Sequence, residues 1–300
     1  MKVITRIAEL KQAIWELKTG HNRFHLAPVG FVPTMGYLHE GHLSLVEEAK
    51  KQCFIVIMSI FVNPLQFGQN EDLDQYPRDI ERDKQLASEA GVDLLFLPTV
   101  EEMYPRSQRT TVHISELTNV LCGASRPDHF DGVTTVVSKL FHIVQPDKAF
   151  FGLKDAQQVA VIEQMVEDLN MNVEIVPCPI VREKDGLAKS SRNVYLSPEE
   201  RKQALVLSAA LNDTLTWLSE QKEFNTQEVR QRLVDRISSQ PLADIDYVEV
   251  LSYPSLKPLP ERLTLSNNVD ERIIFALAVR FGGTRLIDNA IFHWGEISHV

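Results

Sequence analysis

The sequence predicts an α/β fold: a parallel sheet with helices on both faces, followed by a smaller α+β domain. Two observations in the first 180 residues support the sheet. Short β-branched or aromatic runs alternate with segments of helical periodicity, which is the pattern of strand–helix–strand units. The strand-like runs are continuously apolar, as expected of strands that are buried on both faces. Such sheets bind ligands at the carboxyl ends of their strands, so functional residues are expected there.

The elements of the sheet domain follow one another along the chain. Residues 1–18 alternate charged and apolar positions, which predicts an amphipathic helix. Strands are expected at residues 29–32, 54–61, 93–97, 149–151 and 173–181. Helices are expected between several of them, at residues 42–52, 80–90, 134–144 and 157–169.

The pattern changes after residue 181. The polar stretch 182–193 contains the turn-forming pair Asp185-Gly186 and predicts a loop or hinge. Ser197 and Pro198 are typical of a helix start, and that helix is expected to run through residue 220. A further helix is expected at 226–238, and strands are expected at 247–252, 272–280 and 284–292. We therefore predict a first domain at 1–184 and a smaller α+β domain at 185–300.

Charge and composition exclude several classes of protein. The 300 residues include 31 Lys and Arg against 41 Asp and Glu, a net charge of −10. This charge repels the nucleic-acid backbone, while an anionic small substrate would require a local cationic pocket. No apolar run approaches the ~20 residues that span a bilayer, and we see no secretory signal. Three dispersed cysteines suit neither a disulfide scaffold nor a structural zinc site. We expect a cytoplasmic protein without nucleic-acid or membrane partners.

The most informative segment is FVPTMGYLHEGHLSLVEE, residues 31–48. An apolar strand ends at Pro33-Thr34, and a helix begins near His42. The N-terminus of a helix binds anions through its free backbone N–H groups and its dipole. His39 and His42 lie on either side of a glycine that lets a ligand approach the backbone. This combination fits the phosphates of a nucleoside triphosphate.

Other interpretations of this segment are weaker. The zinc motif H-E-x-x-H requires its second histidine at the position of Leu43. The phosphate loop G-x-x-x-x-G-K-S/T is absent, and no G-x-G-x-x-G follows the first strand. Two histidines that merely cap a helix remain as the structural alternative.

Polar residues also follow other strands. Asn63 and Gln66 come after the 54–61 strand, where they could hydrogen-bond a polar substrate or serve only the loop. Lys154 and Asp155 come after the 149–151 strand, where a lysine can meet phosphate and a carboxylate can bind a ribose hydroxyl. Either Gln157 or the next glutamine should face the same crevice.

Three further clusters carry charge. The segment 189–192, KSSR, supplies two cations and two hydroxyls, which suits a phosphate grip or a charged linker. The acidic residues between 72 and 83 are either a solvated face or include a magnesium ligand. Residues 69–78 are turn-rich and could form a lid. Arg126, His129 and Asp131 precede a helix, where another anion contact is possible.

Six blocks together resemble the pantoate–β-alanine ligase (pantothenate synthetase) family of His-x-Gly-His nucleotidyltransferases. The signature here is His39-Glu40-Gly41-His42. The blocks are PTMGYLHEGHLSLV, FVNPLQF, YPRD, RPDHFDGV, FGLKDAQQ and DGLAKSSRNVYLS, in the family's order and spacing. One His-x-Gly-His motif is weak, because class I tRNA synthetases and cytidylyltransferases share it. Six ordered blocks along nearly the whole chain are specific.

The resemblance implies a Rossmann-like sheet domain and an AMP-forming ligase. Such an enzyme condenses (R)-pantoate with β-alanine through pantoyl adenylate, uses ATP with Mg²⁺, and is a cytoplasmic homodimer. Residues 111–121 are a candidate dimer interface. A cytidylyltransferase-like enzyme and a non-catalytic nucleotide sensor are the alternatives. The first would need more basic residues at the crevice, and the second would not need both Gln66 and Gln158.

Site residues carry over by position. ATP would be bound by Pro33, Thr34, Met35, His39, His42, Gly152, Lys154, Asp155, Val181, Lys189, Ser190, Ser191 and Arg192. The catalytic residues would be His42, His39 and Lys154, and the substrate ligands Met35, Asn63, Gln66 and Gln158. Gln66 would hold pantoate and the incoming β-alanine, and Gln158 would be the second pantoate ligand. Asp83 would be the magnesium position. Lys189 departs from the family, which has an apolar residue there, so the role of its side chain is open.

Overall fold

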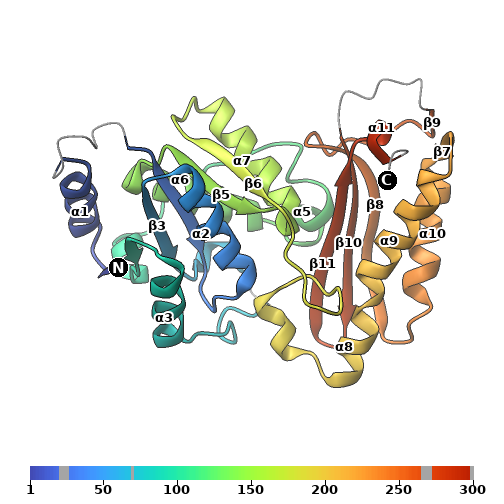
Figure 1. Ribbon diagram of the computed structural model, residues 1–300, viewed down its shortest axis with the longest axis horizontal. Coiled ribbons are helices and arrows are strands. Elements are labelled where there is room, and N and C mark those ends of the chain that lie inside the picture. The colour runs from blue at the N-terminus through green and yellow to red at the C-terminus, as the bar shows by residue number, and fades with distance from the viewer. Residues whose placement is uncertain (20–26, 69–70, 265–271, 298–300) are drawn as a thin grey trace. The chain divides into compact units, whose positions relative to one another are not determined.

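The computed structural model describes residues 1–19, 27–68, 71–264 and 272–297 (Figure 1). The chain forms two compact units. The first comprises Met1–Ser115, Arg126–Leu153 and Val161–Val181, and the second comprises Glu116–Ser125, Lys154–Ala160 and Arg182–Val300. The predicted domains 1–184 and 185–300 stay a prediction. No helix in the described ranges is long and apolar enough to cross a membrane.

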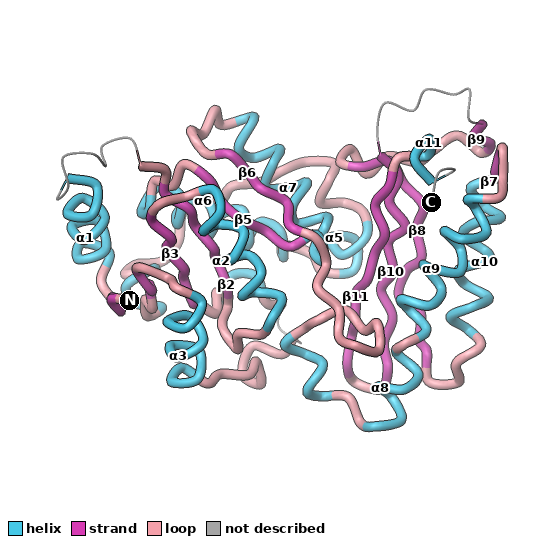
Figure 2. The backbone as a smooth tube through the Cα atoms, viewed as in Figure 1, coloured by secondary structure: helices cyan, strands magenta, loops and turns pink. Residues whose placement is uncertain are grey.

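A six-stranded parallel sheet forms the centre of the first unit (Figures 1 and 2). Its strands are β1 (Lys2–Ile4), β2 (Val29–Thr34), β3 (Ile55–Ile60), β4 (Leu94–Phe96), β5 (Lys148–Gly152) and β6 (Glu174–Cys178). Their order is β1-β4-β3-β2-β5-β6, and every neighbouring pair is parallel. All six residues of β3 are buried, as its continuous apolar sequence predicts. The predicted fold class is confirmed.

Helices cover both faces of this sheet. The helical elements are α1 (Ile7–Thr19), α2 (Glu40–Gln52), η1 (Pro64–Gln66), α3 (Ile80–Ala90), α4 (Val100–Met103) and α6 (His129–Val144), while α7 (Ala156–Asp168) contributes residues to both units. Within the sheet, β3 and β4 lie on one side of β2, and β5 and β6 lie on the other side. Right-handed crossovers therefore place α2 and α3 on one face and α6 on the other. Accordingly, α2 contacts α3, and α1 contacts α6.

The structure corrects three predicted boundaries. Residues 1–18 are not one helix: β1 comes first and pairs with β4, and α1 begins at Ile7. A strand of three residues is too short for its period to be separated from that of the helix behind it. The helix expected at 134–144 begins earlier, at His129, and the strand expected at 173–181 is shorter, as β6 ends at Cys178.

Antiparallel strands and helices form the second unit, which confirms the expected α+β pattern. The main sheet has the order β11-β10-β8, with β8 (Ala243–Tyr253), β10 (Arg272–Phe281) and β11 (Thr284–Phe292); β7 (Glu223–Asn225) pairs with β9 (Arg262–Thr264). The helical elements are α5 (Leu121–Ser125), η3 (Ser191–Tyr195), α8 (Pro198–Ala204), α9 (Val206–Ser219), α10 (Thr226–Ser238) and α11 (Trp294–Ile297), and η2 (Leu153–Asp155) contributes residues to both units. Ser197 caps α8 as predicted, with Glu200 completing a capping box. The helix expected to reach residue 220 is divided at Leu205.

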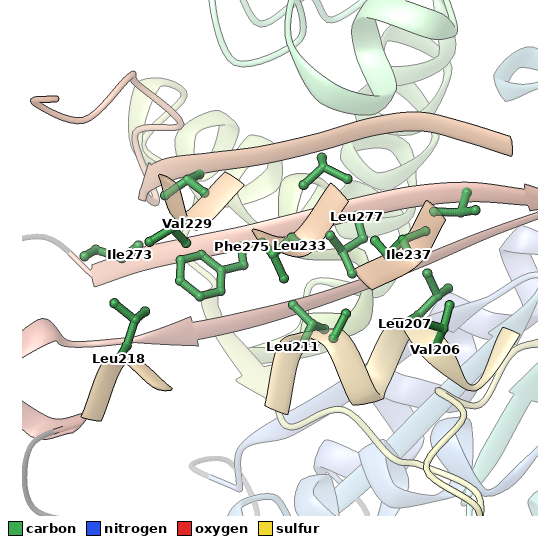
Figure 3. Packing of buried hydrophobic residues seen from close by; sticks show 14 of the residues in the cluster. Val206, Leu207, Leu211, Leu218, Val229, Leu233, Ile237, Ile273, Phe275 and Leu277 are labelled. Atoms are coloured by element: carbon green, nitrogen blue, oxygen red, sulfur yellow. The ribbon is translucent and has the colours of Figure 1, made fainter. Parts of the chain in front are cut away.

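Side chains of α9, α10 and β10 fill the core of the second unit (Figure 3). Val229, Leu233 and Ile237 recur every fourth residue, so one face of α10 is apolar and packs towards Phe275 and Leu277 of the sheet. Truncating such a buried leucine to alanine costs about 2–5 kcal/mol in general. This core stabilises the unit that carries Lys154 and the segment 189–192.

Candidate functional site

The strand order of the sheet reverses between β2 and β5. In open α/β sheets, ligands bind beyond the carboxyl ends of the strands at such a reversal. Thr34 ends β2 and Gly152 ends β5, so the segment that starts at Met35 and leads into α2 lies at this point. A Cβ atom added to Gly152 would meet no atom within 4 Å, so there is space beside its backbone.

Two histidines cap the N-terminus of α2. His39 is the N-cap residue, and its Nδ1 accepts a hydrogen bond from the N–H of Gly41 (3.1 Å). The Nδ1 of His42 accepts from the N–H of His39 (3.3 Å), and the ring centroids lie 4.0 Å apart. A nitrogen that accepts carries no proton, so both neutral rings carry theirs on Nε2. The two histidines therefore cap the helix through Nδ1, as the structural alternative predicts. Each ring still carries an N–H donor at Nε2.

A tight turn precedes this cap. Gly36 and Tyr37 have positive φ angles of 89° and 50°, and the Thr34 hydroxyl accepts from the Gly36 N–H (3.2 Å). The same hydroxyl donates to the Ser59 carbonyl on the neighbouring strand (2.8 Å). A Cβ on Gly36 would lie 2.7 Å from Ile60 Cγ2. Glycine is thus required here both by its backbone conformation and by its close approach to β3.

Asp83 of α3 holds the next part of the loop. Its Oδ2 accepts from the N–H of Tyr37 and its Oδ1 from the N–H of Leu38, both at 2.7 Å. The side chain is fully buried, and this burial raises the pKa of Asp83, although the two amides act in the opposite direction. Both carboxylate oxygens are engaged by backbone, which argues against the predicted magnesium position. Among the described residues, no group of three or more His, Cys, Asp or Glu side chains could hold a metal ion.

Met35, Asn63 and Gln66 meet in the first unit. Asn63 caps η1, the short helical turn that ends at Gln66. The Gln66 amide Nε2 donates to the Met35 sulfur (3.1 Å), and its Oε1 accepts from Asn63 Nδ2 (3.2 Å). Both amide side chains are buried. The structure therefore brings three of the predicted substrate ligands into direct contact.

The predicted anion contact at Arg126 and His129 is used within the protein instead. The Arg126 guanidinium forms a two-point ion pair with Glu71 (2.7 and 2.5 Å). Burial alone would raise the pKa of Glu71, but the hydrogen bonds and charge of Arg126 lower it overall. The His129 Nδ1 donates to the carbonyl of Gln66 (2.7 Å), because a carbonyl can only accept. Asp131 contacts His113 (2.8 Å).

Lys154 and Asp155 lie at the start of α7 in the second unit. The ammonium of Lys154 is 3.1 Å from a carboxylate oxygen of Asp155. The Lys154 carbonyl accepts from the side-chain amide of Asn289 on β11 (3.0 Å). That contact fixes the backbone at the position where the sequence predicts a phosphate or ribose ligand.

The two glutamines that follow have different surroundings. Gln157 is buried, and its Oε1 accepts from the N–H of Cys122 (2.9 Å). Its Nε2 donates to the carbonyls of Leu117 and Val120 (2.8 and 2.7 Å). Gln157 thus holds the segment before α5, and the partly exposed Gln158 is the one left to contact a ligand.

The segment 189–192 leads into η3. Ser190 caps η3 by accepting from the N–H of Arg192 (3.3 Å), and Ser191 is buried. Before it, Arg182 pairs with Ala188 in an isolated β-bridge, and Gly186 has a φ of 95°, which confirms the predicted turn. The segment before residue 189 is thus a turn closed by backbone pairing, as expected of a loop, and its role as a hinge stays a prediction.

The candidate residues therefore belong to two sets. The first unit contains Pro33, Thr34, Met35, His39, His42, Asn63, Gln66, Asp83, Gly152 and Val181, and the second contains Lys154, Asp155, Gln158, Lys189, Ser190, Ser191 and Arg192. Sequence reasoning missed Glu71 and Tyr104, whose partners are 55 and 41 residues away along the chain. No local pattern signals contacts of that kind.

Comparisons with known proteins agree along nearly the whole chain. The family model described as pantoate-beta-alanine ligase matches residues 2–291. A protein named pantothenate synthetase from Acetivibrio thermocellus is 55% identical over 294 residues, which are 97% of this chain and 99% of that protein.

Solved structures show the same architecture. The pantothenate synthetase from Thermus thermophilus has a TM-score of 0.86 at 47% identity and covers 97% of this chain and 99% of its own. The pantoate-beta-alanine ligase from Francisella tularensis, complexed with beta-gamma ATP and β-alanine, has a TM-score of 0.75 at 32% identity and covers 97% of both chains.

Proposed function

The chain belongs to the pantoate–β-alanine ligase family, and we propose that the residues at the carboxyl end of its parallel sheet join pantoate to β-alanine with ATP. The carboxylate of pantoate attacks the α-phosphorus of ATP and releases pyrophosphate. The amine of β-alanine then attacks the acyl carbon of pantoyl adenylate and expels AMP. The observation that carries the proposal is the pair of capping histidines at the reversal of the sheet, with both protons on Nε2.

His39 and His42 are proposed to bind the phosphates of ATP. Two anionic reactants repel each other, so donors that are already aligned lower the barrier by shielding and orienting them. Alignment of the reactants can lower the activation barrier by ~7–11 kcal/mol. Proton transfer by a histidine typically accelerates a reaction 10²–10⁴-fold, which is a lowering of about 3–5 kcal/mol. Positioning therefore dominates, and the neutral Nε2–H groups supply it without a resident charge.

The remaining assignments follow the resemblance. Gly152 and Val181 are proposed to hold adenosine, Asp155 the ribose, and Lys154 with the segment 189–192 the phosphates. Gln66 and Gln158 are proposed to hold pantoate, with Met35 and Asn63 beside Gln66. The sheet domain 1–184 would bind ATP and pantoate, and the domain 185–300 would complete the ligase.

Magnesium, location and assembly are further parts of the proposal. ATP is proposed to react as its magnesium complex; Asp83 is fully buried and accepts from two backbone N–H groups, so its carboxylate fits a role in holding the loop better than one as a metal ligand. The enzyme is proposed to be a cytoplasmic homodimer, and light scattering after size-exclusion chromatography tests the dimer.

The decisive experiment is exchange between ATP and labelled pyrophosphate in the absence of β-alanine. Exchange that requires pantoate is expected. Exchange with a phosphorylated alcohol instead would support a cytidylyltransferase-like enzyme, and no exchange at all would support a nucleotide sensor. The neutralisation of Arg126 by Glu71 disfavours a phosphorylated substrate beside Gln66.

Two variants test the roles of the site residues. His42→Ala should lower the exchange at least 100-fold, and exposed His142→Ala is the matched control. Circular dichroism should show both folded. Gln66→Ala should raise the KM for pantoate, and an unchanged KM would give Gln66 a structural role only.

A further inference from the structure

The orientation of the Asn63 side-chain amide is fixed by backbone groups. The N–H of Leu65 donates to its Oδ1 (3.3 Å), and its Nδ2 donates to the carbonyl of Gly132 (3.1 Å). A backbone N–H cannot accept and a carbonyl cannot donate, so exchanging the oxygen and nitrogen of the amide would break both bonds. Asn63 is only 1% exposed, so water could not replace them.

This orientation is passed on to Gln66. The same Asn63 Nδ2 lies 3.2 Å from one end of the Gln66 amide, which must therefore be the oxygen. The other end, Nε2, then faces the sulfur of Met35 at 3.1 Å. A thioether is a weak acceptor, which a carboxylate or hydroxyl oxygen of a ligand can displace. Gln66 thus offers N–H donors on that side.

Tyr104 makes a further hydrogen bond to the Asn63 side-chain amide. Its hydroxyl donates to Asn63 Oδ1 (2.9 Å), since an amide oxygen only accepts. The ammonium of Lys139 lies 4.9 Å from the centre of the Tyr104 ring, and the Phe61 ring lies 6.0 Å away. Burial raises the pKa of Tyr104 to about 12, so the phenol remains a donor at neutral pH.

The backbone of Gln66 is held independently of its side chain. Its carbonyl accepts from His129 Nδ1 (2.7 Å), and the Nε2 of that ring lies 3.1 Å from the guanidinium of Arg126. Because Arg126 can only donate, Nε2 accepts and the proton of neutral His129 is on Nδ1. The position of Gln66 and the direction of its amide are therefore set by separate contacts.

We propose that Tyr104 is a positioning residue, which acts through Asn63 to hold the Gln66 amide with its N–H donors towards the substrate. The inference rests on the proposed role of Gln66 as a pantoate ligand. It adds that Gln66 meets oxygen atoms of pantoate through these N–H donors.

The first test is a double-mutant cycle of Tyr104→Phe and Gln66→Met. Phenylalanine keeps the ring and loses one hydrogen bond, so the KM for pantoate should rise about two- to twelve-fold, while kcat and the KM for ATP stay unchanged. In the Gln66→Met background, Tyr104→Phe should have no further effect, because the amide through which it is proposed to act is gone. Tyr247→Phe, which removes the hydroxyl that contacts Cys122 (3.2 Å), is the matched control and should leave the KM unchanged.

Three results separate the inference from the function on which it rests. An unchanged KM in Tyr104→Phe, or an equal rise in both backgrounds, overturns the inference alone. If Gln66→Met itself leaves the KM for pantoate unchanged, the assignment of Gln66 in the proposed function fails. Thermal unfolding of each variant shows that it is folded.

A second variant tests the direction of the amide without touching Tyr104. Gln66→Glu keeps an oxygen for Asn63 and replaces the N–H donors by a second oxygen. The KM for pantoate should then rise further than in Gln66→Met, and the KM for β-alanine should not fall. A KM for pantoate at or below that of Gln66→Met would show that Gln66 offers its oxygen to the substrate and would overturn the inference.

Discussion

Replacing Asp83 with asparagine should loosen the loop that carries the two histidines. The carboxylate accepts one hydrogen bond from the N–H of Tyr37 and one from the N–H of Leu38, both at 2.7 Å. Asparagine has one oxygen, so one of these N–H groups would face the side-chain NH₂ group instead. The group is fully buried, and water cannot take over the lost contact.

The size of the effect follows from these contacts. A hydrogen bond to a charged group contributes about 1.5–3 kcal/mol, and a buried donor left unpaired costs about 1–3 kcal/mol more. Part of the loss is offset, because burial raises the pKa of Asp83 and a neutral amide avoids that desolvation. We expect a net loss of about 2–4 kcal/mol in the free energy of unfolding.

Urea denaturation and the KM for ATP measure the two consequences of Asp83→Asn. Both should change, since the same loop is needed for stability and for the proposed phosphate contacts. Glu81→Gln is the control on the same helix: its side chain is 85% exposed, and its pair with Lys84 should contribute less than about 0.5 kcal/mol. A variant Asp83→Asn with the unfolding free energy and the ATP KM of the original protein would refute the reasoning.

Three further predictions concern other parts of the first unit. Gly132→Ala should raise the KM for pantoate about tenfold or more and lower the melting temperature, because its Cβ would overlap the Leu65 carbonyl in the turn that carries the substrate ligands; steady-state kinetics and calorimetry check this. Arg126 lowers the pKa of Glu71, so the contribution of Glu71 to stability is present above about pH 4.3 and is lost as pH falls through the pKa of the folded state. Below pH 5, the free energy of unfolding should therefore fall more steeply with decreasing pH in the original protein than in Glu71→Gln, as urea denaturation at each pH can measure. Burial raises the pKa of Cys178 to about 11, so only about one thiol in a thousand is ionised at pH 8, and a disulfide reagent should modify it in the folded protein far more slowly than in urea.

Patterns that arise within a short stretch of chain predicted most of the fold. Continuous apolar runs located β2 to β5, because a strand buried on both faces must be apolar at nearly every position, and the apolar run of the edge strand β6 located it as well. The N-cap at Ser197 was also predictable, because its signal lies within the next three residues. The division of the following helix at Leu205 was not foreseeable, since leucine is a good helix former and Leu205 itself keeps αR backbone angles.

The candidate residues could be named from the sequence, but the contacts among them could not. The sequence brought Gln66 and Asn63 to one loop, yet it could not show that the amide of one orients the other. Tyr104 and Asp83 reach their partners across 41 and 45 residues, and only the folded sheet places these groups together. The same limit made Arg126 look available for an anion, when Glu71, 55 residues earlier, neutralises it.

A net charge of −10 poses a problem for a protein whose two proposed substrates, ATP and pantoate, are anions. In the first unit, the proposed contacts to these anions are neutral N–H donors, and backbone groups set the direction in which they point. The Gly41 N–H determines which nitrogen of His39 is protonated, and Leu65 and Gly132 determine which end of Gln66 faces outward. Donors fixed in advance need no reorganisation when charge moves during the reaction, so they stabilise the transition state more than mobile surface cations would. The acidic surface and the proposed anion contacts of the first unit are therefore compatible, because these contacts are made by oriented dipoles and need no net charge.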